Sequence, residues 1–262
     1  MFFRLSTASV AAVLTLIIFG AAAAGAGVGL RRRRRPGADH QPVGVVQGVM
    51  LGFVGLLLAF GLSQSVARYD TRRALVVQEA NAIGTTYLRA QMLAEPVRTR
   101  SLDHLRRYGD LAVHLADEVP DSDAFDADAA RMDVTQQALW ALAGDAVRDD
   151  PRGTAPRLYV ETLNQTIDSH TDRVTSVRNR VPGTVLLLQV AGSAIAIFVL
   201  ALYLAMLGRR VAAVFIAAGV VTLIIFISVD LDRPHRGLIT VPDSALVSTR
   251  AMMDLPPAAD GP

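Results

Sequence analysis

The sequence has no cysteine and no lysine, and it contains little charge. Only 19% of its 262 residues are charged, whereas 52% are hydrophobic, and its mean hydropathy is +0.36. Without cysteine the chain can form no disulfide, thiolate nucleophile, zinc–thiolate site or iron–sulfur ligation. All 26 basic side chains are arginine, but the formal net charge of +2 indicates no nucleic-acid partner. So apolar a composition is typical of a membrane protein.

Charges are missing above all from four long runs: residues 6–30, 43–62, 183–207 and 211–229. At 1.5 Å per residue, a helix of about 20 residues spans the apolar core of a bilayer, which is about 30 Å thick. We therefore predict an all-α membrane protein with four transmembrane helices. A water-exposed helical domain, residues 63–182, is inserted between the second and third spans, and a tail with a disordered end occupies residues 230–262.

The first run, within residues 1–30, also resembles a secretory signal peptide, because an apolar stretch is followed by small residues suited to cleavage. The loop at residues 31–42 opens with five arginines, Arg31 to Arg35. A cluster of arginines directly behind an apolar run resists translocation. We therefore expect the first helix to be retained, with cleavage as the alternative.

The second span combines glycines at regular spacing with isolated aromatic residues. Gly44, Gly48 and Gly52 recur at every fourth position, which places three notches on one helix face and lets another backbone approach. Glycine is also simply common in transmembrane helices, so this alternative stays open. The candidates for pore lining or helix packing are Gly44, Gln47, Gly48, Gly52, Phe53 and Phe60. Gln47 and Gln189 of the third span can form hydrogen bonds across helices.

Polar candidates follow in the predicted helical domain and after the fourth span. Arg68, Arg72 and Arg73 would draw anions toward the mouth of a pore. Glu161, Asn164 and Asp168 lie near one helical face, where they could hold a divalent cation or pair with Arg72 or Arg73. The alternative is a solvated face with intrahelical pairs in which Arg173 opposes Asp168 and Asp172. Further polar-cluster candidates are Glu79, Asp230 and Asp232, and we expect Trp140 to pack in the helical core.

Arginines in the short loops predict the orientation. Arg31 to Arg35 and the pair Arg209 and Arg210 lie on one side of the predicted spans, and such residues favour the cytoplasm. This places the amino terminus, the helical domain and the tail outside the cell.

Four stretches of sequence resemble the bestrophin-like domain family of bacterial membrane proteins. They are ARYDTRRALVVQEANAIGTTYLRA, HLRRYGDL, LYVETLNQTIDSHTDRV and DLDRPHRGLI, and the resemblance extends from residue 43 to residue 239. The family is named for its similarity to bestrophin anion channels, which are pentamers with a pore lined by the second span. The resemblance thus implies a homo-oligomer, and it places the helical domain in the cytoplasm, opposite to the arginine rule. The aromatic pattern of the bestrophin pore neck is absent from the second span, and the acidic cluster after the fourth is reduced to Asp230 and Asp232.

We weigh three functions for a multi-pass protein of the bacterial plasma membrane whose surroundings are the lipid bilayer. The first is an oligomeric, anion channel-like protein; the alternative is a non-conducting scaffold or envelope sensor that binds a protein partner through its helical domain. No ionisable group lies within the spans, which argues against a pump or coupled transporter. An enzyme is least supported, since paired histidines at metal spacing, a phosphate-binding glycine loop and a nucleophile elbow are all missing. We expect no catalytic residue, metal or cofactor.

Overall fold

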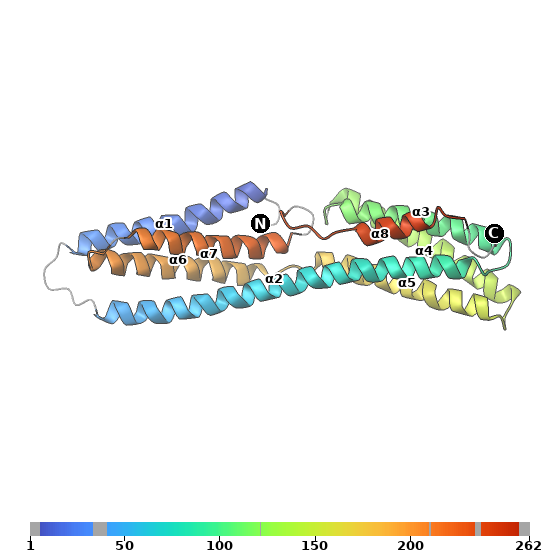
Figure 1. Ribbon diagram of the computed structural model, residues 1–262, viewed down its shortest axis with the longest axis horizontal. Coiled ribbons are helices and arrows are strands. Elements are labelled where there is room, and N and C mark those ends of the chain that lie inside the picture. The colour runs from blue at the N-terminus through green and yellow to red at the C-terminus, as the bar shows by residue number, and fades with distance from the viewer. Residues whose placement is uncertain (1–5, 34–40, 121, 210, 234–236, 257–262) are drawn as a thin grey trace. The chain divides into compact units, whose positions relative to one another are not determined.

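The computed structural model describes residues 6–33, 41–120, 122–209, 211–233 and 237–256, and these residues form helices, turns and bends without any strand. Figure 1 shows the helices in chain order. They are α1 (Thr7–Arg33), α2 (Gln41–Ala90), α3 (Val97–Asp117), α4 (Asp123–Asp149), α5 (Thr154–Arg178), α6 (Gly183–Met206), α7 (Ala212–Leu231) and α8 (Ser244–Met252). The predicted all-α class is confirmed.

The chain divides into two compact units. The first, here called the membrane unit, comprises Met1–Tyr69 and Arg180–Thr240, and the second, the helical unit, comprises Asp70–Asn179 and Val241–Pro262. Helix α2 begins in the membrane unit and ends in the helical unit. The helical unit is therefore not only the inserted segment that the sequence predicts, because the C-terminal part of the chain joins it.

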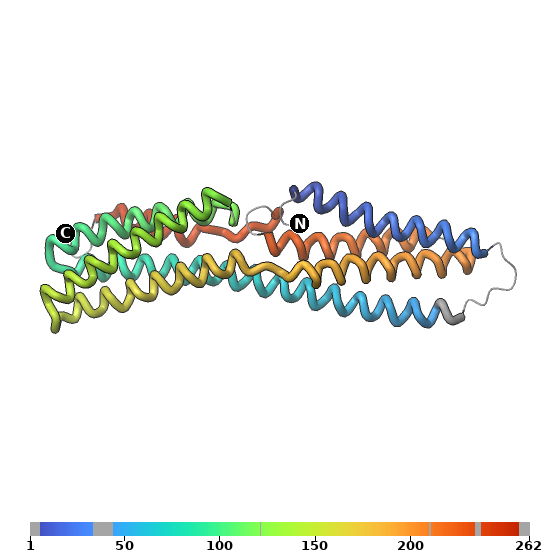
Figure 2. Tube along the Cα trace, turned by 180° about the vertical axis from the view of Figure 1, so that it is seen from behind, coloured from blue at the N-terminus to red at the C-terminus, as the bar shows by residue number. Residues whose placement is uncertain are grey.

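The membrane unit contains the apolar parts of α1, α2, α6 and α7. These four helices are long and apolar enough to cross a bilayer, which confirms the four predicted spans. Both views of the chain show α1, α6 and α7 side by side (Figures 1 and 2). Buried side chains of the four helices form two apolar clusters, one around Leu14, Leu58 and Ile225 and one around Ile18 and Val214.

Close approach of two backbones joins α1 to α6. A Cβ atom at Gly25 would overlap the carbonyl oxygen of Phe198, and a Cβ atom at Gly29 would come 2.5 Å from that of Leu202. Glycines four residues apart thus let the helices touch along their backbones, as in other membrane proteins. Removal of α1 would expose this face of α6, and the retention of the first helix stays a prediction.

The helical unit packs α3, α4, α5 and the second part of α2 around a shared apolar core. Its most deeply buried side chains include Tyr87, Leu105, Met132, Leu139 and Leu163. The side chain of Ser122 accepts a hydrogen bond from the backbone N–H of Phe125 and so caps α4, as hydroxyls commonly do at helix starts. Trp140 is 47% exposed, and the prediction that it packs in the core is wrong.

Helix α8 was not predicted from the sequence. Leu246 and Met253 are buried in the core of the helical unit. The Tyr87 hydroxyl and the Arg106 Nε both donate hydrogen bonds to the carbonyl oxygen of Met253, at 2.9 and 3.1 Å. The end of the tail for which we predict disorder falls mostly on residues 257–262, which lie outside the described residues.

Candidate pore helix and buried polar clusters

Within the membrane unit α2 is the span least covered by its own chain. Only 11% of the residues in its most apolar window are buried, against 28%, 39% and 33% for the spans of α1, α6 and α7. A stripe along it is exposed and entirely apolar: Val45, Val49, Phe53, Leu56 and Phe60. This face is available to lipid or to another copy of the chain.

The predicted glycine notch of α2 is only partly filled within the protomer. A Cβ atom at Gly44 would lie 2.8 Å from the Tyr203 hydroxyl of α6, whereas nothing lies within 4 Å of the corresponding positions at Gly48 and Gly52. Gln47 is half-buried. Two of the three glycines thus lie on open surface, together with the exposed rings of Phe53 and Phe60.

A hydrogen bond from a side chain crosses from α6 to α2. The Nε2 of Gln189, which is buried, donates to the carbonyl oxygen of Leu57 at 3.2 Å. The Gln189 amide occupies the space that a side chain at Gly61 would need. The prediction that Gln189 bonds across helices is confirmed.

Arg72 does not stand at an open mouth, which corrects its predicted role in attracting anions. The side chain is 2% exposed. Its Nε donates to the carbonyl oxygen of Ser176 at 3.3 Å and its Nη2 to that of Asn179 at 2.9 Å. The last carbonyls of a helix have no intrahelical donor, so Arg72 closes the end of α5. Arg68 is half-buried and Arg73 is exposed.

A buried ionic cluster joins α2 to α5 in the helical unit. The Glu79 side chain is 0% exposed, and its carboxylate contacts His170 Nδ1 at 3.0 Å and pairs with Arg173 Nε. Arg173 Nη2 also donates to the carbonyl oxygen of Ala112 on α3, at 3.5 Å. Arg173 therefore lies in the core, and the prediction that it opposes Asp168 and Asp172 on the surface is wrong.

Tyr108 extends this cluster to α3 and α4. Its ring meets that of His170 edge-on, with centroids 6.1 Å apart, and its hydroxyl accepts a hydrogen bond from Gln136 Nε2 at 3.0 Å. Burial, and secondly the charge of Glu79, raises the pKa of Tyr108. The buried polar network thus includes a side chain from each of four helices, α2, α3, α4 and α5.

The polar face of α5 is solvated rather than built around a cation. Asn164 Nδ2 donates to Asp168 Oδ2 at 3.1 Å on exposed surface. Glu161 is paired at 3.6 Å with Arg89, and not with Arg72 or Arg73 as we considered. Within the described ranges no three His, Asp or Glu side chains gather as metal ligands would.

Asp230 and Asp232 are both buried at the end of α7, where they bind backbone amides. Asp230 Oδ2 accepts from the N–H groups of Leu238 and Ile239 at 2.8 and 3.0 Å, and Asp232 Oδ2 accepts from that of Val181 at 2.8 Å. Charge-assisted bonds of this kind are strong. The two carboxylates therefore anchor the segments that follow α7 and precede α6.

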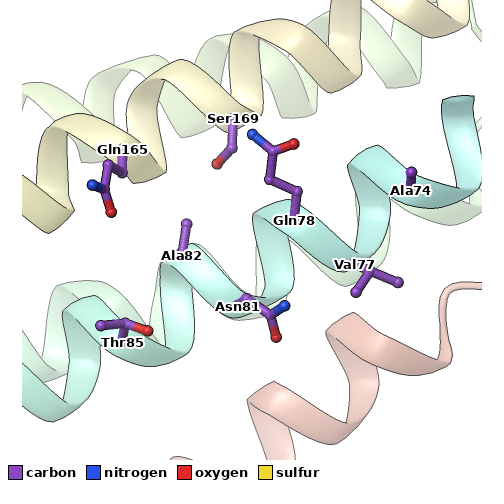
Figure 3. Close-up of a pocket in the computed structure, with 8 residues that line it drawn as sticks. All are labelled: Ala74, Val77, Gln78, Asn81, Ala82, Thr85, Gln165 and Ser169. Carbon is purple, nitrogen blue, oxygen red and sulfur yellow. The ribbon is translucent and has the colours of Figure 1, made fainter.

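A groove between α2 and α5 is lined without any charged side chain. It has a volume of about 460 Å³, and Figure 3 shows Gln78, Asn81 and Thr85 of α2 along it with Gln165 and Ser169 of α5. Sequence reasoning missed this site. The available signal was the helical spacing of Ala74, Gln78, Asn81 and Thr85, which form a neutral row in a part of α2 that otherwise carries charged residues.

These features define a class, an all-α membrane protein with four helices long and apolar enough to span a bilayer. The chain belongs to the Bestrophin-like domain family, because that domain matches residues 14–246. A variant of a bacterial bestrophin homologue from Klebsiella pneumoniae has a similar structure, with a TM-score of 0.64 and 13% identity over 90% of this chain and 97% of the homologue.

A second solved structure, a variant of a membrane protein, also has a TM-score of 0.64, with 12% identity over 98% of this chain and 99% of that protein. No curated protein shows significant sequence similarity. The family predicted from the sequence motifs is confirmed, and at these identities the two structures show the fold alone.

Proposed function

We propose that several copies of this chain assemble around an axis and conduct anions, with α2 facing that axis. The observation that carries the proposal is a row of exposed, uncharged residues along α2 in each unit, with exposed Asp70 and Arg73 at the start of the row in the helical unit. In the membrane unit this row is the apolar stripe from Val45 to Phe60. In the helical unit it consists of exposed Thr71, Ala74, Gln78, Asn81 and Thr85.

Lipid alone could account for an apolar face, but it cannot account for the second half of α2. A helix surface in bulk water normally carries charged residues. The neutral row in the helical unit instead offers amide and hydroxyl donors, which can replace part of the water around an anion. Arg68, Asp70 and Arg73 lie near the start of this row, where their net positive charge raises the local anion concentration.

The match to the Bestrophin-like domain adds support, because that family is named for its similarity to bestrophin anion channels, in which the second span lines the pore. The open positions at Gly48 and Gly52 suit close approach by other copies of α2. The exposed rings of Phe53 and Phe60 would form apolar constrictions, which gate by dewetting.

Planar-bilayer recording of the purified protein tests the proposal. We expect an anion current, and we expect Phe60→Ala to raise it by widening an apolar constriction. Ile216→Ala is the matched control, because Ile216 of α7 is also exposed, at 72%, but lies off α2. Bilayers that stay silent across pH and calcium concentration, with all variants, would argue for the non-conducting alternative.

Asn81→Asp tests the part of the path in the helical unit. A carboxylate on the neutral face should repel anions and lower the current severalfold. Asn164→Asp adds the same charge to exposed surface of α5 outside the groove and should leave the current unchanged. Equal effects of the two variants would mean that the groove is not on the path.

The orientation and the number of copies need separate measurements. The arginines of the short loops support an extracytoplasmic helical unit, and we retain that orientation as a proposal. Reporter fusions after Arg35 and after Asp150 should then report opposite sides, with the second outside. Native mass spectrometry of the detergent-solubilised protein should give a single oligomer larger than a monomer.

A further inference from the structure

One end of the membrane unit carries only positive charge among its described residues. Helix α1 ends on Arg31, Arg32 and Arg33, and the turn from α6 to α7 contributes Arg209. All four side chains are exposed. The Arg33 guanidinium lies about 3 Å from the position that a Cβ atom would take at Gly208, whose φ is +71°. The arginines of the two segments therefore form one surface.

No carboxylate balances this surface within the described part of the chain. Helices α1 and α6 contain no acidic residue, and α7 contains none before Asp230 at its far end. The ion pairs of the described residues include none of Arg31, Arg32, Arg33 or Arg209. Like charges held together repel one another, and a bound anion relieves that repulsion.

The position of this surface indicates which anion is available. Each group of arginines directly follows an apolar helix that is long enough to span a bilayer, so the guanidinium groups lie at the depth of the lipid headgroups. Tyr203 in the last turn of α6 is half-buried against α2, as is common for tyrosine at a membrane interface. Anionic phospholipids present a high density of phosphate at this depth.

We propose that Arg31, Arg32, Arg33 and Arg209 bind the phosphodiester headgroup of an anionic phospholipid such as phosphatidylglycerol. A guanidinium donates two parallel hydrogen bonds to phosphate oxygens. Since the chain has no lysine, the inference rests on where the arginines gather and not on the choice of arginine. It requires neither anion conduction nor a particular orientation of the helical unit.

The test compares full-length protein in nanodiscs of phosphatidylcholine with and without phosphatidylglycerol, with bound lipid counted by native mass spectrometry. Replacing all four arginines with glutamine should weaken retention of phosphatidylglycerol by about tenfold, because each lost cation lowers the attraction at the surface. The matched control makes four such changes at exposed arginines of the helical unit, Arg100, Arg107, Arg152 and Arg157. The control should bind phosphatidylglycerol like the wild type.

A second variant replaces the same four arginines with lysine, so that the charge that orients the helices is kept. It should retain less phosphatidylglycerol than the wild type, because lysine cannot form the two-bond contact with phosphate. This readout remains valid if the glutamine variant fails to insert. Wild-type retention by both variants would overturn the proposal. So would displacement of the lipid by millimolar inorganic phosphate, since the site would then take free phosphate.

Discussion

The membrane unit and the helical unit hold their helices together by different means. In the membrane unit backbones touch, with Gly25 and Gly29 of α1 against carbonyl groups of α6. In the helical unit charged side chains are buried between helices, namely Glu79, Arg173 and Arg72. Within its spans the membrane unit depends on the absence of side chains, and its buried carboxylates, Asp230 and Asp232, lie at the end of α7. The helical unit depends on the chemistry of side chains buried between its helices.

The difference follows from the solvent around each unit. Apolar side chains gain little by leaving lipid for a helix interface, so close packing stabilises a membrane bundle. In water, burial of residues such as Tyr87, Leu105 and Met132 releases about 25 cal/mol per Å² of apolar surface. That gain offsets the cost of burying an ion pair, and it explains why the buried ionic cluster lies in the helical unit.

Glu79→Gln should have the largest effect on stability, about 3–5 kcal/mol, because Arg173 and His170 would lose the charge that they face in the core. The only tryptophan, Trp140, lies in the helical unit, so denaturant unfolding followed by its fluorescence reports on this unit. Glu161→Gln is the control. Its pair with Arg89 is exposed and should contribute about 0–1 kcal/mol.

Equal losses from Glu79→Gln and Glu161→Gln would show that the buried cluster adds nothing beyond a surface pair. A double variant sharpens the test. Glu79→Leu combined with Arg173→Met removes both charges and should cost less than the sum of the single changes, because the two residues are in direct contact.

Gly25→Ala in the membrane unit should have the next largest effect, a loss of about 1–3 kcal/mol of stability. The added methyl group meets the Phe198 backbone, so α1 and α6 must move apart. Gly27→Ala is a close control on the same helix, since nothing lies within 4 Å of its Cβ position. It should be neutral or slightly stabilising. Titration with sodium dodecyl sulfate in mixed micelles, followed by circular dichroism, measures both. A destabilising Gly27→Ala with a neutral Gly25→Ala would contradict the observed packing.

The sequence predicted those parts of the fold that follow from hydropathy and helical spacing. The four spans could be predicted because a bilayer requires long apolar helices whatever lies next to them. The GxxxG pattern was noticed in α2 but not in α1, and only that of α1 is fully packed within the protomer. Spacing shows that a face can approach another backbone, but it does not show whether the partner is the same chain or another copy.

Side chains whose roles depend on distant residues were harder to predict. The charge of Arg72 suggested a position at the mouth of a pore. The Arg72 side chain instead donates hydrogen bonds to backbone carbonyls more than 100 residues later in the chain. Glu79 and Arg173 meet across two helices, and nothing local to either residue indicates the pair. Helix α8 is short, and its burial depends on Leu246 and Met253 meeting the helical core, which periodicity alone does not show.

Alkaline pH should weaken the helical unit through its buried tyrosines. Burial raises the pKa of Tyr159 to about 12, whereas an unfolded tyrosine titrates near 10. The contribution of Tyr159 to the free energy of unfolding is therefore complete below pH 10. It is lost as the pH rises toward 12, by about 1 kcal/mol at pH 11. Tyr159→Phe should flatten this decline, as measured by unfolding at a series of pH values. An unchanged alkaline slope would mean that Tyr159 is reached by water in the folded protein.

Gln189→Leu should have the smallest effect, because bonds between helices in membranes average about 0.6 kcal/mol. The substitution removes the bond to the Leu57 carbonyl but keeps a side chain of similar length beside Gly61. Gln47→Leu is the control, since Gln47 is half-buried on the less covered part of α2. Titration with sodium dodecyl sulfate should separate the two variants by a few tenths of a kcal/mol. A loss above that of Gly25→Ala would reverse the comparison, because polar bonding rather than close backbone packing would then dominate the membrane unit.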